Sequence, residues 1–544
     1  MFTRYINSLK KEFQGYNSGT LIKDILAGLT VAAVALPLAL AFGVSSGADG
    51  AAGLITAIIA GIMIGTLSGA SYQISGPTGA MSAILIGLSQ TYGLQGVFIA
   101  SFLSGCMLLI ASIFKFGKVV SFIPTSVITG FTSGIAIIIA SGQIDNFFGV
   151  TSKGSGTIDK FVSYFTNGFN VNMTTMLIGL AVIVIMVLWP KKIANVFPAS
   201  LAAIIIMLVV NLFANFDVAV VGTIPSTLLP KERLLISSIN LDALTALMIP
   251  AVSIAALGMI ESLLCGASAS KMKNEKLDAD QELLAQGLGN MLIPFFGGVP
   301  ATAAIARTSV AIKAGGQTRL VSVFHSVTLL LAMFILGPFM AKIPLSALAG
   351  VLIVTAWKMN EWHEIKKMFR NKVKTPITQF LITMLATVVF DLTVAIVIGV
   401  LMSMILFVLN NADLNIEVSD IDHDRLDVDL SQTHKGNRVV YLEGPLFFGT
   451  QEQLTKEMEK IIPTSNAIVL SMRGVPSIDD SGISELVEIF DLCQNNNVKL
   501  LFSGVQKGVL KQMKRNGFVV FVGEDKFYWD AIAAIKYLDT INTK

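Results

Sequence analysis

An arginine stands in the middle of apolar sequence, at a place where it could hold an anion. Residues 297–309 read GGVPATAAIARTS, and no charged residue occurs between Glu282 and Arg307. A lone arginine in hydrocarbon costs roughly 2.5–3.5 kcal/mol on insertion scales, so we expect it to have a function. The glycines and proline that open the segment cannot lie in a regular spanning helix, whereas the residues from Thr302 onward can. The pattern predicts a helix that begins part-way through a membrane, and helix N-termini attract anions.

A second interrupted segment lies early in the chain, again without nearby charge. Residues 72–81 read YQISGPTGAM, where Gly76 permits a turn and Pro77 suits the first position of a helix. Each segment is the third element of its half of the chain, and broken helices at matching positions indicate an inverted-repeat transporter with a midplane site. The alternative is that glycine and proline merely ease helix packing.

A carboxylate also falls inside apolar sequence. Glu261 ends a charge-free run that begins at residue 243. An intramembrane carboxylate is by default a proton or coupling-ion site, so we predict that role for Glu261. The alternative is a structural ion pair between Glu261 and Arg307. His325, in a later apolar segment, is predicted to be a packing histidine whose ring nitrogens are satisfied.

The overall composition indicates what kind of protein must position these groups. The chain has 544 residues, of which 53% are hydrophobic and 14% charged. Soluble domains average about 45–50% apolar and about 25% charged residues, so this is a membrane protein. The net charge of +3 and the absence of a basic run argue against nucleic-acid binding. The three cysteines are far apart, and neither a metal-ligand spacing nor a nucleophile–base pair is present, so we expect no metal site and no enzyme activity.

The apolar sequence predicts a polytopic helical domain. Charge-free windows recur from residue 25 to residue 412, and dividing them at Gly, Pro and Asn clusters gives about twelve to fourteen spans, with fourteen favoured. The basic loops then all fall on one side, which the positive-inside rule makes cytoplasmic. These loops are residues 115–118, 191–192, 271–276, 313–319 and 358–374. Both termini are therefore predicted to be cytoplasmic.

From about Asn411 the composition changes to that of a small soluble α/β domain. Predicted strands are residues 439–442, 467–470 and 498–502, and predicted helices are residues 450–462, 481–495 and 506–516. The domain prediction is a cytoplasmic N-terminal segment (1–23), a transmembrane domain (24–410), and a linker with a soluble domain (411–544).

Several motifs together resemble those of the sulfate permease (SulP) family of anion transporters, bacterial type. The matching pieces are residues 35–42 (ALPLALAF), 75–79 (SGPTG), 122–131 (FIPTSVITGF), Gly134, Gln143, 221–225 (VGTIP), 261–263 (ESL), Gln286-Gly287 with Asn290, and 298–308 (GVPATAAIART). The soluble tail resembles the STAS domain through residues 468–482 (IVLSMRGVPSIDDSG). A tyrosine usual at the start of the second span is replaced here by Ala52.

This resemblance implies two inverted repeats of seven spans, with core and gate domains that move against one another in a bacterial inner membrane. The anion would lie between the facing ends of the third and tenth helices, with hydroxyls of Thr78 and Thr302 and nearby free N–H groups as donors. The implied site residues are Gln73, Ser75, Gly76, Thr78, Gly79, Ala301, Thr302, Ala303 and Arg307. H⁺ or Na⁺ would be the coupling ion at Glu261, a sodium ion also using Gly298 and Thr302, and no other cofactor is implied. A homodimer and a cytoplasmic protein partner of the STAS domain are further expectations.

The favoured function is secondary active transport of sulfate, bicarbonate or a C4-dicarboxylate across the plasma membrane. Two alternatives remain open. One is an uncoupled anion channel or exchanger, which would show no ion dependence. The other is an anion-sensing receptor that signals through the STAS domain, which would bind substrate without flux.

Overall fold

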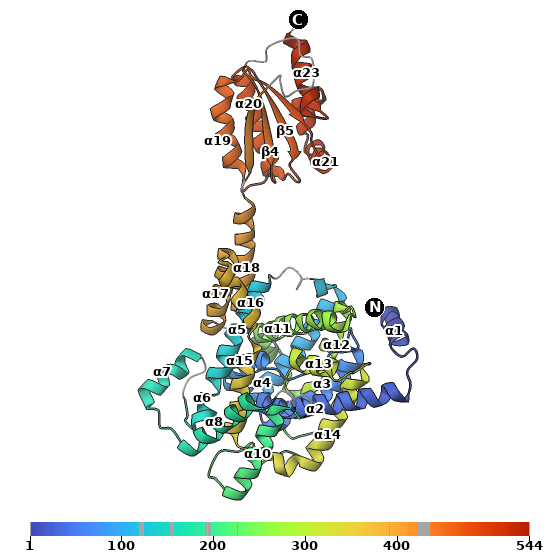
Figure 1. The fold of residues 1–544 in the computed structure, drawn as a ribbon, viewed down its shortest axis with the longest axis vertical. Coiled ribbons are helices and arrows are strands. Elements are labelled where there is room, and N and C mark those ends of the chain that lie inside the picture. Colours follow the sequence, from blue (N-terminus) through green and yellow to red (C-terminus); the bar gives the residue numbers. More distant parts are fainter. Residues whose placement is uncertain are drawn as a thin grey trace. The chain divides into compact units, whose positions relative to one another are not determined.

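The computed structural model describes residues 2–118, 124–152, 157–190, 193, 197–225, 227–390, 392–412, 414–421 and 436–542 (Figure 1). The chain divides into two units, Met1–Leu401 and Met402–Lys544. Each unit has a hydrophobic core of its own, so each is described by itself. Residues 122–123 of the resemblance and the predicted basic loop at 191–192 lie outside the described residues.

The first unit is built of helices. The long apolar helices are α2 (Ser18–Ser45), α3 (Gly50–Leu67), α4 (Gly79–Ile113), α5 (Thr125–Gly142), α11 (Leu241–Lys273) and α14 (Leu320–Met340). Shorter apolar helices are α8 (Met173–Leu188), α10 (Ala199–Ala214), α15 (Leu345–Met359) and α17 (Lys374–Val389), and α18 (Leu392–Asn411) begins in this unit and continues past Leu401. The other elements are α1 (Phe2–Glu12), α6 (Ile144–Phe148), α7 (Thr157–Asn167), α12 (Ala279–Leu292), α13 (Ile305–Lys313), α16 (Trp362–Asn371), η2 (Ile236–Ser238), η3 (Ile293–Phe296), β1 (Ser75–Gly76) and β2 (Thr302–Ala303).

The helix order agrees with the predicted number of spans. By length and composition, six helices in the described ranges can cross a membrane. α4 is two helices joined at Gly93, whose φ of 68° is not helical, so it supplies two spans. With the shorter apolar helices and the two short helices α12 and α13, this gives fourteen segments among the described residues. The third segment of each seven is the one that follows a strand, namely the first part of α4 after β1 and α13 after β2.

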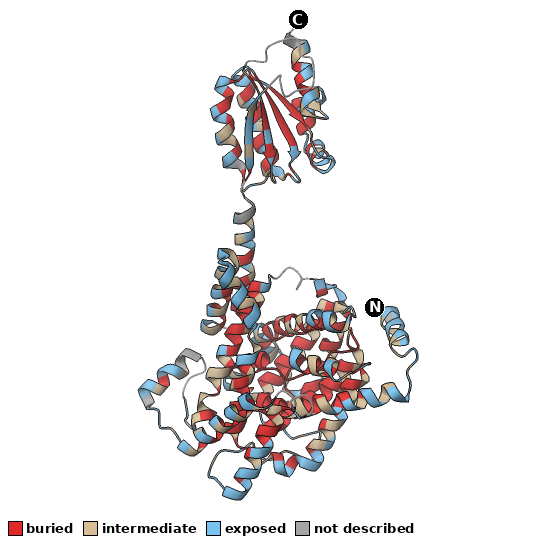
Figure 2. Ribbon diagram, viewed as in Figure 1, coloured by how far each residue is buried: buried red, intermediate tan, exposed pale blue. Residues whose placement is uncertain are grey.

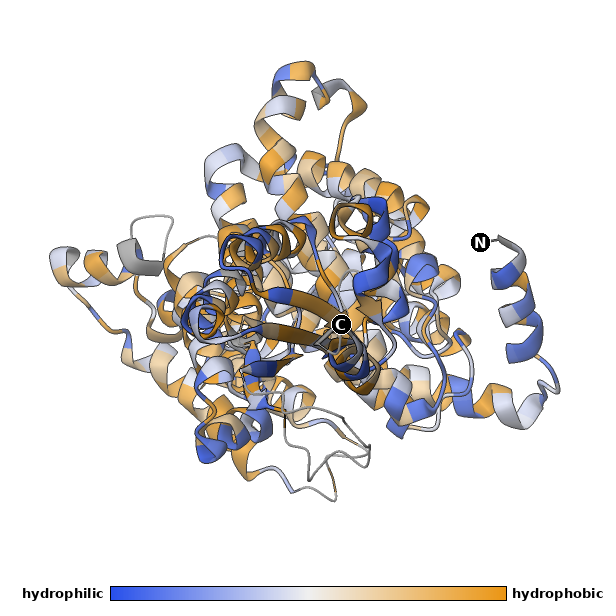
Figure 3. Ribbon diagram, turned by 90° about the horizontal axis from the view of Figure 1, so that it is seen from above, coloured by the Kyte–Doolittle hydropathy of each residue, from blue (hydrophilic) through white to orange (hydrophobic). Residues whose placement is uncertain are grey.

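The outer surface of the helical unit is apolar. Figure 2 shows buried residues concentrated in its central helices, whereas Figure 3 shows hydrophobic residues continuing onto the peripheral ones. Phe213 of α10 is 87% exposed, and Leu188 and Ile335 are also largely exposed. Exposed aliphatic and aromatic side chains on this scale are expected where lipid tails cover them. The unit is therefore a multi-pass membrane domain.

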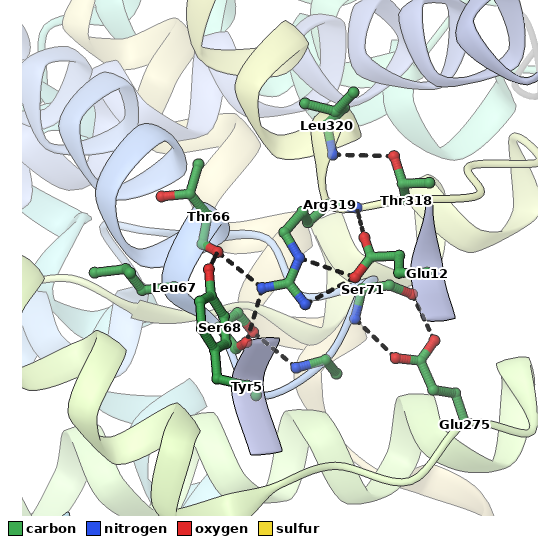
Figure 4. Close-up of polar contacts among 12 residues, drawn as sticks. Tyr5, Glu12, Thr66, Leu67, Ser68, Ser71, Glu275, Thr318, Arg319 and Leu320 are labelled. Atoms are coloured by element: carbon green, nitrogen blue, oxygen red, sulfur yellow. Dashed lines mark hydrogen bonds and ion pairs between the residues drawn. The ribbon is translucent and has the colours of Figure 1, made fainter. Parts of the chain in front are cut away.

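The N-terminal helix α1 is attached to the membrane domain by a buried ion pair (Figure 4). Glu12 accepts hydrogen bonds from Nε, Nη2 and the backbone N–H of Arg319, at 2.9, 2.8 and 2.7 Å. Arg319 also donates to the carbonyls of Thr66 and Ser68, and its guanidinium lies over the ring of Tyr5. The predicted N-terminal segment thus contains a helix that closes the ends of α3 and α14, which the sequence did not indicate.

The second unit is a five-stranded sheet flanked by helices. The strand order is β3 (Asn415–Asp420), β4 (Asn437–Glu443), β5 (Ala467–Gly474), β6 (Lys499–Ser503) and β7 (Phe527–Tyr528), antiparallel between β3 and β4 and parallel elsewhere. The helices are α19 (Gln451–Ile461), η4 (Ile462–Thr464), α20 (Asp480–Asn495), α21 (Lys507–Arg515), α22 (Phe518–Val522), η5 (Glu524–Lys526) and α23 (Ala531–Asn542). The three predicted strands and three predicted helices are confirmed, because short runs of apolar residues alternate there with amphipathic ones.

Candidate functional site

The two interrupted segments meet inside the membrane domain. β1 and β2 pair antiparallel, with Ser75 opposite Ala303 and Gly76 opposite Thr302. The pairing brings together the starts of α4 and α13, whose first N–H groups have no acceptor within their own helices. Two positive helix ends are thereby directed to one place in apolar surroundings.

The strands correct two details of the predicted helix starts. Helix α13 begins at Ile305 and not at Thr302, because Thr302 and Ala303 are held extended by the pairing with β1. Helix α4 begins at Gly79 with Thr78 as its N-cap, so Pro77 lies two residues before the first helical position. The Thr78 hydroxyl accepts from the N–H of Met81 at 3.4 Å, which is a capping role that a proline cannot fill.

Glu261 of α11 connects the two segments. Its Oε2 accepts hydrogen bonds from Oγ1 of Thr302 at 2.6 Å and from Oγ1 of Thr78 at 2.8 Å. The two hydroxyl oxygens are 3.3 Å apart. In this state both threonine hydroxyls donate to the carboxylate, so they are not available to an anion as we predicted.

Arg307 is buried with most of its guanidinium unpartnered. The residue is 1% exposed, and it is among the largest fully buried side chains. Nη2 donates to the carbonyl of Pro77, whereas Nε and Nη1 have no partner in the described chain. A Cβ atom at residue 76 would overlap Nη1, so a side chain there would displace the guanidinium from this position. A buried cation with open donors is costly, and such groups call for a ligand or water.

The alternative of a structural ion pair has little support from the geometry. Among the ion pairs of the described residues, none joins Arg307 to Glu261. Glu261 is satisfied by threonine hydroxyls, and Arg307 by a carbonyl from the other segment. The two opposite charges lie in one site without neutralising each other by direct contact.

Several other predicted site residues are close by, but their polar groups are used by the protein. Gln73 donates to the carbonyl of Ser262 at 2.8 Å, although its Oε1 is unpartnered. Ser75 accepts from Nε2 of Gln286. Both backbone groups of Ala301 bond to Asn290, and the N–H of Ala303 donates to Ser262 at 3.2 Å. The N–H of Ala303 is therefore not free, and these residues hold the strands rather than offer donors.

The sequence missed the residues that support the site. Asn290 fixes the backbone before β2, and Ser262 bonds to both interrupted segments. Thr308 accepts from the N–H of Ile74 at 3.1 Å. A signal existed, because Ser262 and Asn290 occur in the motifs that carried the family resemblance, but their partners are distant in sequence.

The proposed sodium ligands are only partly brought together. Glu261 and Thr302 are in contact, but the atoms nearest to the Cβ position of Gly298 belong to Ile293 and Thr56. The described residues contain no group of three or more His, Cys, Asp or Glu side chains that could hold a metal ion. The arrangement offers one carboxylate and hydroxyls to a coupling ion.

His325 differs from its prediction. The residue is fully buried in α14, and neither ring nitrogen has a partner in the part of the chain that the structure describes. The ring packs near the Cβ position of Gly61 on α3, and the backbone N–H of His325 lies near that of Gly28 on α2. Helix packing therefore explains its place, but the predicted satisfaction of its nitrogens was wrong.

A cavity of about 520 Å³ ends beside the site: Gly79 lines it, whereas Arg307 and Glu261 are not among its lining residues. Its inner end is lined by Gly79 and Ser82 of the first turn of α4. It extends past the C-terminal ends of α2 and α17 to helix α7. An anion could thus approach the positive end of α4 from the side where α2 ends.

Comparisons with known proteins agree with these observations. A model described as the sulfate permease family matches residues 21–386, and one described as the STAS domain matches residues 430–529. YvdB of Bacillus subtilis (strain 168), whose assignment as a sulfate transporter is provisional, is 34% identical over 530 residues, covering 95% of this chain and 97% of that protein. The bicarbonate transporter BicA of Picosynechococcus is 29% identical, covering 83% of each chain.

Solved structures show the same fold. The transmembrane domain of a cyanobacterial BicA has a TM-score of 0.65 at 29% identity, covering 70% of this chain and 98% of that one. SLC26A9 has a TM-score of 0.83 at 18% identity, covering 97% of this chain and 92% of that one. The second likeness concerns the fold alone.

Proposed function

The chain belongs to the sulfate permease family, and from this premise we propose that it is a secondary active transporter of small anions that works by alternating access. The relatives are transporters named for sulfate or bicarbonate. Sulfate, bicarbonate and a C4-dicarboxylate are the candidate substrates, since all are small and carry oxygens that need few donors. Transport rather than catalysis is the proposed activity.

The observation that carries the proposal is the open guanidinium of Arg307. Nε and Nη1 are two donors on one planar group, buried and without a partner among the described residues. These two donors point to different sides of the guanidinium, so an oxyanion can accept from either of them in a charge-assisted contact. The unpaired N–H groups at the starts of α4 and α13 would complete the donor set.

The hydrogen bonds of Glu261 support a coupling mechanism. While Glu261 is ionised, it holds the hydroxyl protons of Thr78 and Thr302 and offsets the charge of Arg307. Protonation would remove the negative charge and leave both hydroxyls free to donate to the anion. The anion would then bind more tightly to the protonated protein, and linkage makes the effect reciprocal. A sodium ion bound to Glu261 would act in the same sense.

The remaining expectations are proposals of the same kind. We place both termini in the cytoplasm and the protein in the inner membrane of a bacterium, because the described basic loops lie on one side of the helix order. The seven-helix halves would be inverted repeats, and their antiparallel strands are what oppositely oriented copies would give. A homodimer and a cytoplasmic partner of the STAS domain remain predictions.

Uptake into proteoliposomes tests the function. Labelled sulfate, bicarbonate and succinate are each supplied under a proton, sodium or zero gradient. We expect concentrative, saturable uptake of at least one anion, driven by protons. Uptake without saturation or ion dependence would favour a channel, and binding without flux would favour a receptor.

Coupling is tested by Glu261→Gln, which keeps the shape of the side chain but cannot exchange a proton. We expect anion exchange to continue while gradient-driven accumulation is lost. Glu364→Gln on the surface of α16 is the matched control and should accumulate anion normally. Concentrative uptake by Glu261→Gln would return Glu261 to a structural role.

A further inference from the structure

We propose that Lys160 of helix α7 forms an outer anion-binding station, separate from Arg307, that gathers small anions at the mouth of the cavity before they reach the start of α4. The role of this station as an entrance rests on the proposed transport function. Its affinity for anions rests on the residues that line the cavity.

The cavity has a charge of one sign. Lys160 is the only charged side chain that lines it among the described residues, and most of the lining is aliphatic, aromatic or neutral polar. A cleft with low-dielectric walls and charge of one sign concentrates counter-ions within it. The field of Lys160 therefore favours anions along the whole path to Gly79.

The ammonium group is available to a ligand. Lys160 takes part in no ion pair or side-chain hydrogen bond found among the described residues. Asp145 of α6, which is bonded to α7 through Tyr164, is already occupied, because it accepts from Tyr164 at 2.8 Å and from Ser152 at 2.6 Å. Burial, followed by the hydrogen bond to Asp145, raises the pKa of Tyr164 to about 12, so this phenol remains a donor to Asp145. The carboxylate of Asp145 is thus bonded to Tyr164 and Ser152 and not to Lys160.

Helix α7 is held in place. Phe161, Tyr164, Phe169 and Phe148 form a chain of ring contacts with centroids 5.2–6.2 Å apart. Lys160 and Tyr164 are one turn apart, so both face the cavity. A fixed helix keeps the cation at the mouth, and the side-chain amide of Asn146 lines the cavity beside it as a neutral donor.

The first test measures the local field and does not depend on transport. Asn146→Cys in the full-length protein serves as a reporter, and its reaction rates with an anionic and a cationic methanethiosulfonate are compared. The chain without this cysteine corrects for the native thiols, of which Cys265 and Cys493 are buried. Adding Lys160→Gln should lower the anionic-to-cationic rate ratio roughly threefold to tenfold at low salt, with less effect at high salt.

The matched control is Lys231→Gln, which removes the same charge from an exposed position in the loop between α10 and α11, outside the cavity. It should leave the ratio unchanged. A ratio that does not respond to Lys160→Gln, or responds equally to Lys231→Gln, overturns the station.

The second test concerns transport in proteoliposomes. Lys160→Gln should raise the KM for labelled sulfate or bicarbonate about threefold to tenfold at low ionic strength and leave the maximal rate unchanged. Lys160→Glu should raise it further. If Lys160→Gln changes the reagent ratio but the wild-type protein takes up no anion, the station is retained and the transport function is rejected. If the wild-type protein takes up anion and Lys160→Gln leaves the KM unchanged, the station is rejected as an entrance.

Discussion

At the scale of single residues, the site keeps the opposite charges of Arg307 and Glu261 apart, and each is bonded to other groups of the protein. Arg307 bonds to a carbonyl of the early segment, and Glu261 bonds to threonines of both segments. Each charge therefore depends on the relative position of β1 and β2. An anion that occupies the open donors would favour one arrangement of these strands over others.

The first prediction concerns Arg307→Met, which keeps the length of the side chain and removes the charge. We expect anion affinity to fall about tenfold to a hundredfold, the loss of a charge-assisted hydrogen bond. The melting temperature should change little, because an incompletely paired buried charge is removed rather than created. Arg307→Lys should restore part of the affinity without the planar fork. Both quantities are measured on detergent-purified protein at one pH.

The opposite result is equally specific. If Arg307→Met melts far below wild type and Arg307→Met/Glu261→Gln recovers the loss, the two residues act as a structural ion pair. The anion site would then be misassigned.

A second residue-scale prediction lies in the soluble unit. Burial raises the pKa of Glu485 to about 7, although Thr455 donates twice to its Oε1, and its Oε2 has no partner in the described chain. The folded state thus binds this proton more tightly than the unfolded state. The resulting stability is fully present below about pH 4.5 and is lost as pH rises through 7.

Glu485→Gln should remove this pH dependence and stabilise the unit at pH 8 by about 1–3 kcal/mol. Denaturant unfolding of residues 412–544 at pH 5 and pH 8 measures the effect. Asp491→Asn, exposed on the same helix, is the control and should behave as wild type. Equal stability of wild type at both pH values would contradict the assignment.

At the scale of elements, the sequence predicted the interruptions but not what fills them. Glycine and proline marked where α4 and α13 could not continue outward, and the structure puts paired strands there. Two-residue strands have no detectable periodicity, and their partner lies in the other half of the chain. Which backbone groups stay free for an anion was unpredictable for the same reason, as the engaged N–H of Ala303 illustrates.

The N-terminal helix gives an element-scale prediction. Glu12→Gln should lower the melting temperature of the full-length protein, because the buried Arg319 would lose its carboxylate, which typically costs about 3–5 kcal/mol. Lys10→Gln, exposed on the same helix, should have no such effect. A Glu12→Gln protein as stable as wild type would show that the helix does not support the ends of α3 and α14.

At the scale of the whole molecule, composition predicts a boundary near Asn411, and the structure has two compact units, the second of which begins at Met402. Removing residues 412–544 should leave anion binding intact while lowering transport or expression, since every residue of the candidate site precedes Ser309. Anion binding is measured on the protein without residues 412–544, after thermal unfolding has shown that this protein is folded. Loss of binding in a folded truncation would contradict the division.

Gly76 and Arg307 belong to opposite halves of the chain, yet Nη1 of Arg307 fills the space that a Cβ atom of residue 76 would need. A side chain at residue 76 would push the guanidinium away from the Pro77 carbonyl, so a change at the glycine disturbs the site for as long as the arginine is kept. A lineage that first replaces Arg307 with a short residue is released from this restriction. The order of events is therefore biased, because a substitution at residue 76 disturbs the site less once the arginine has been replaced.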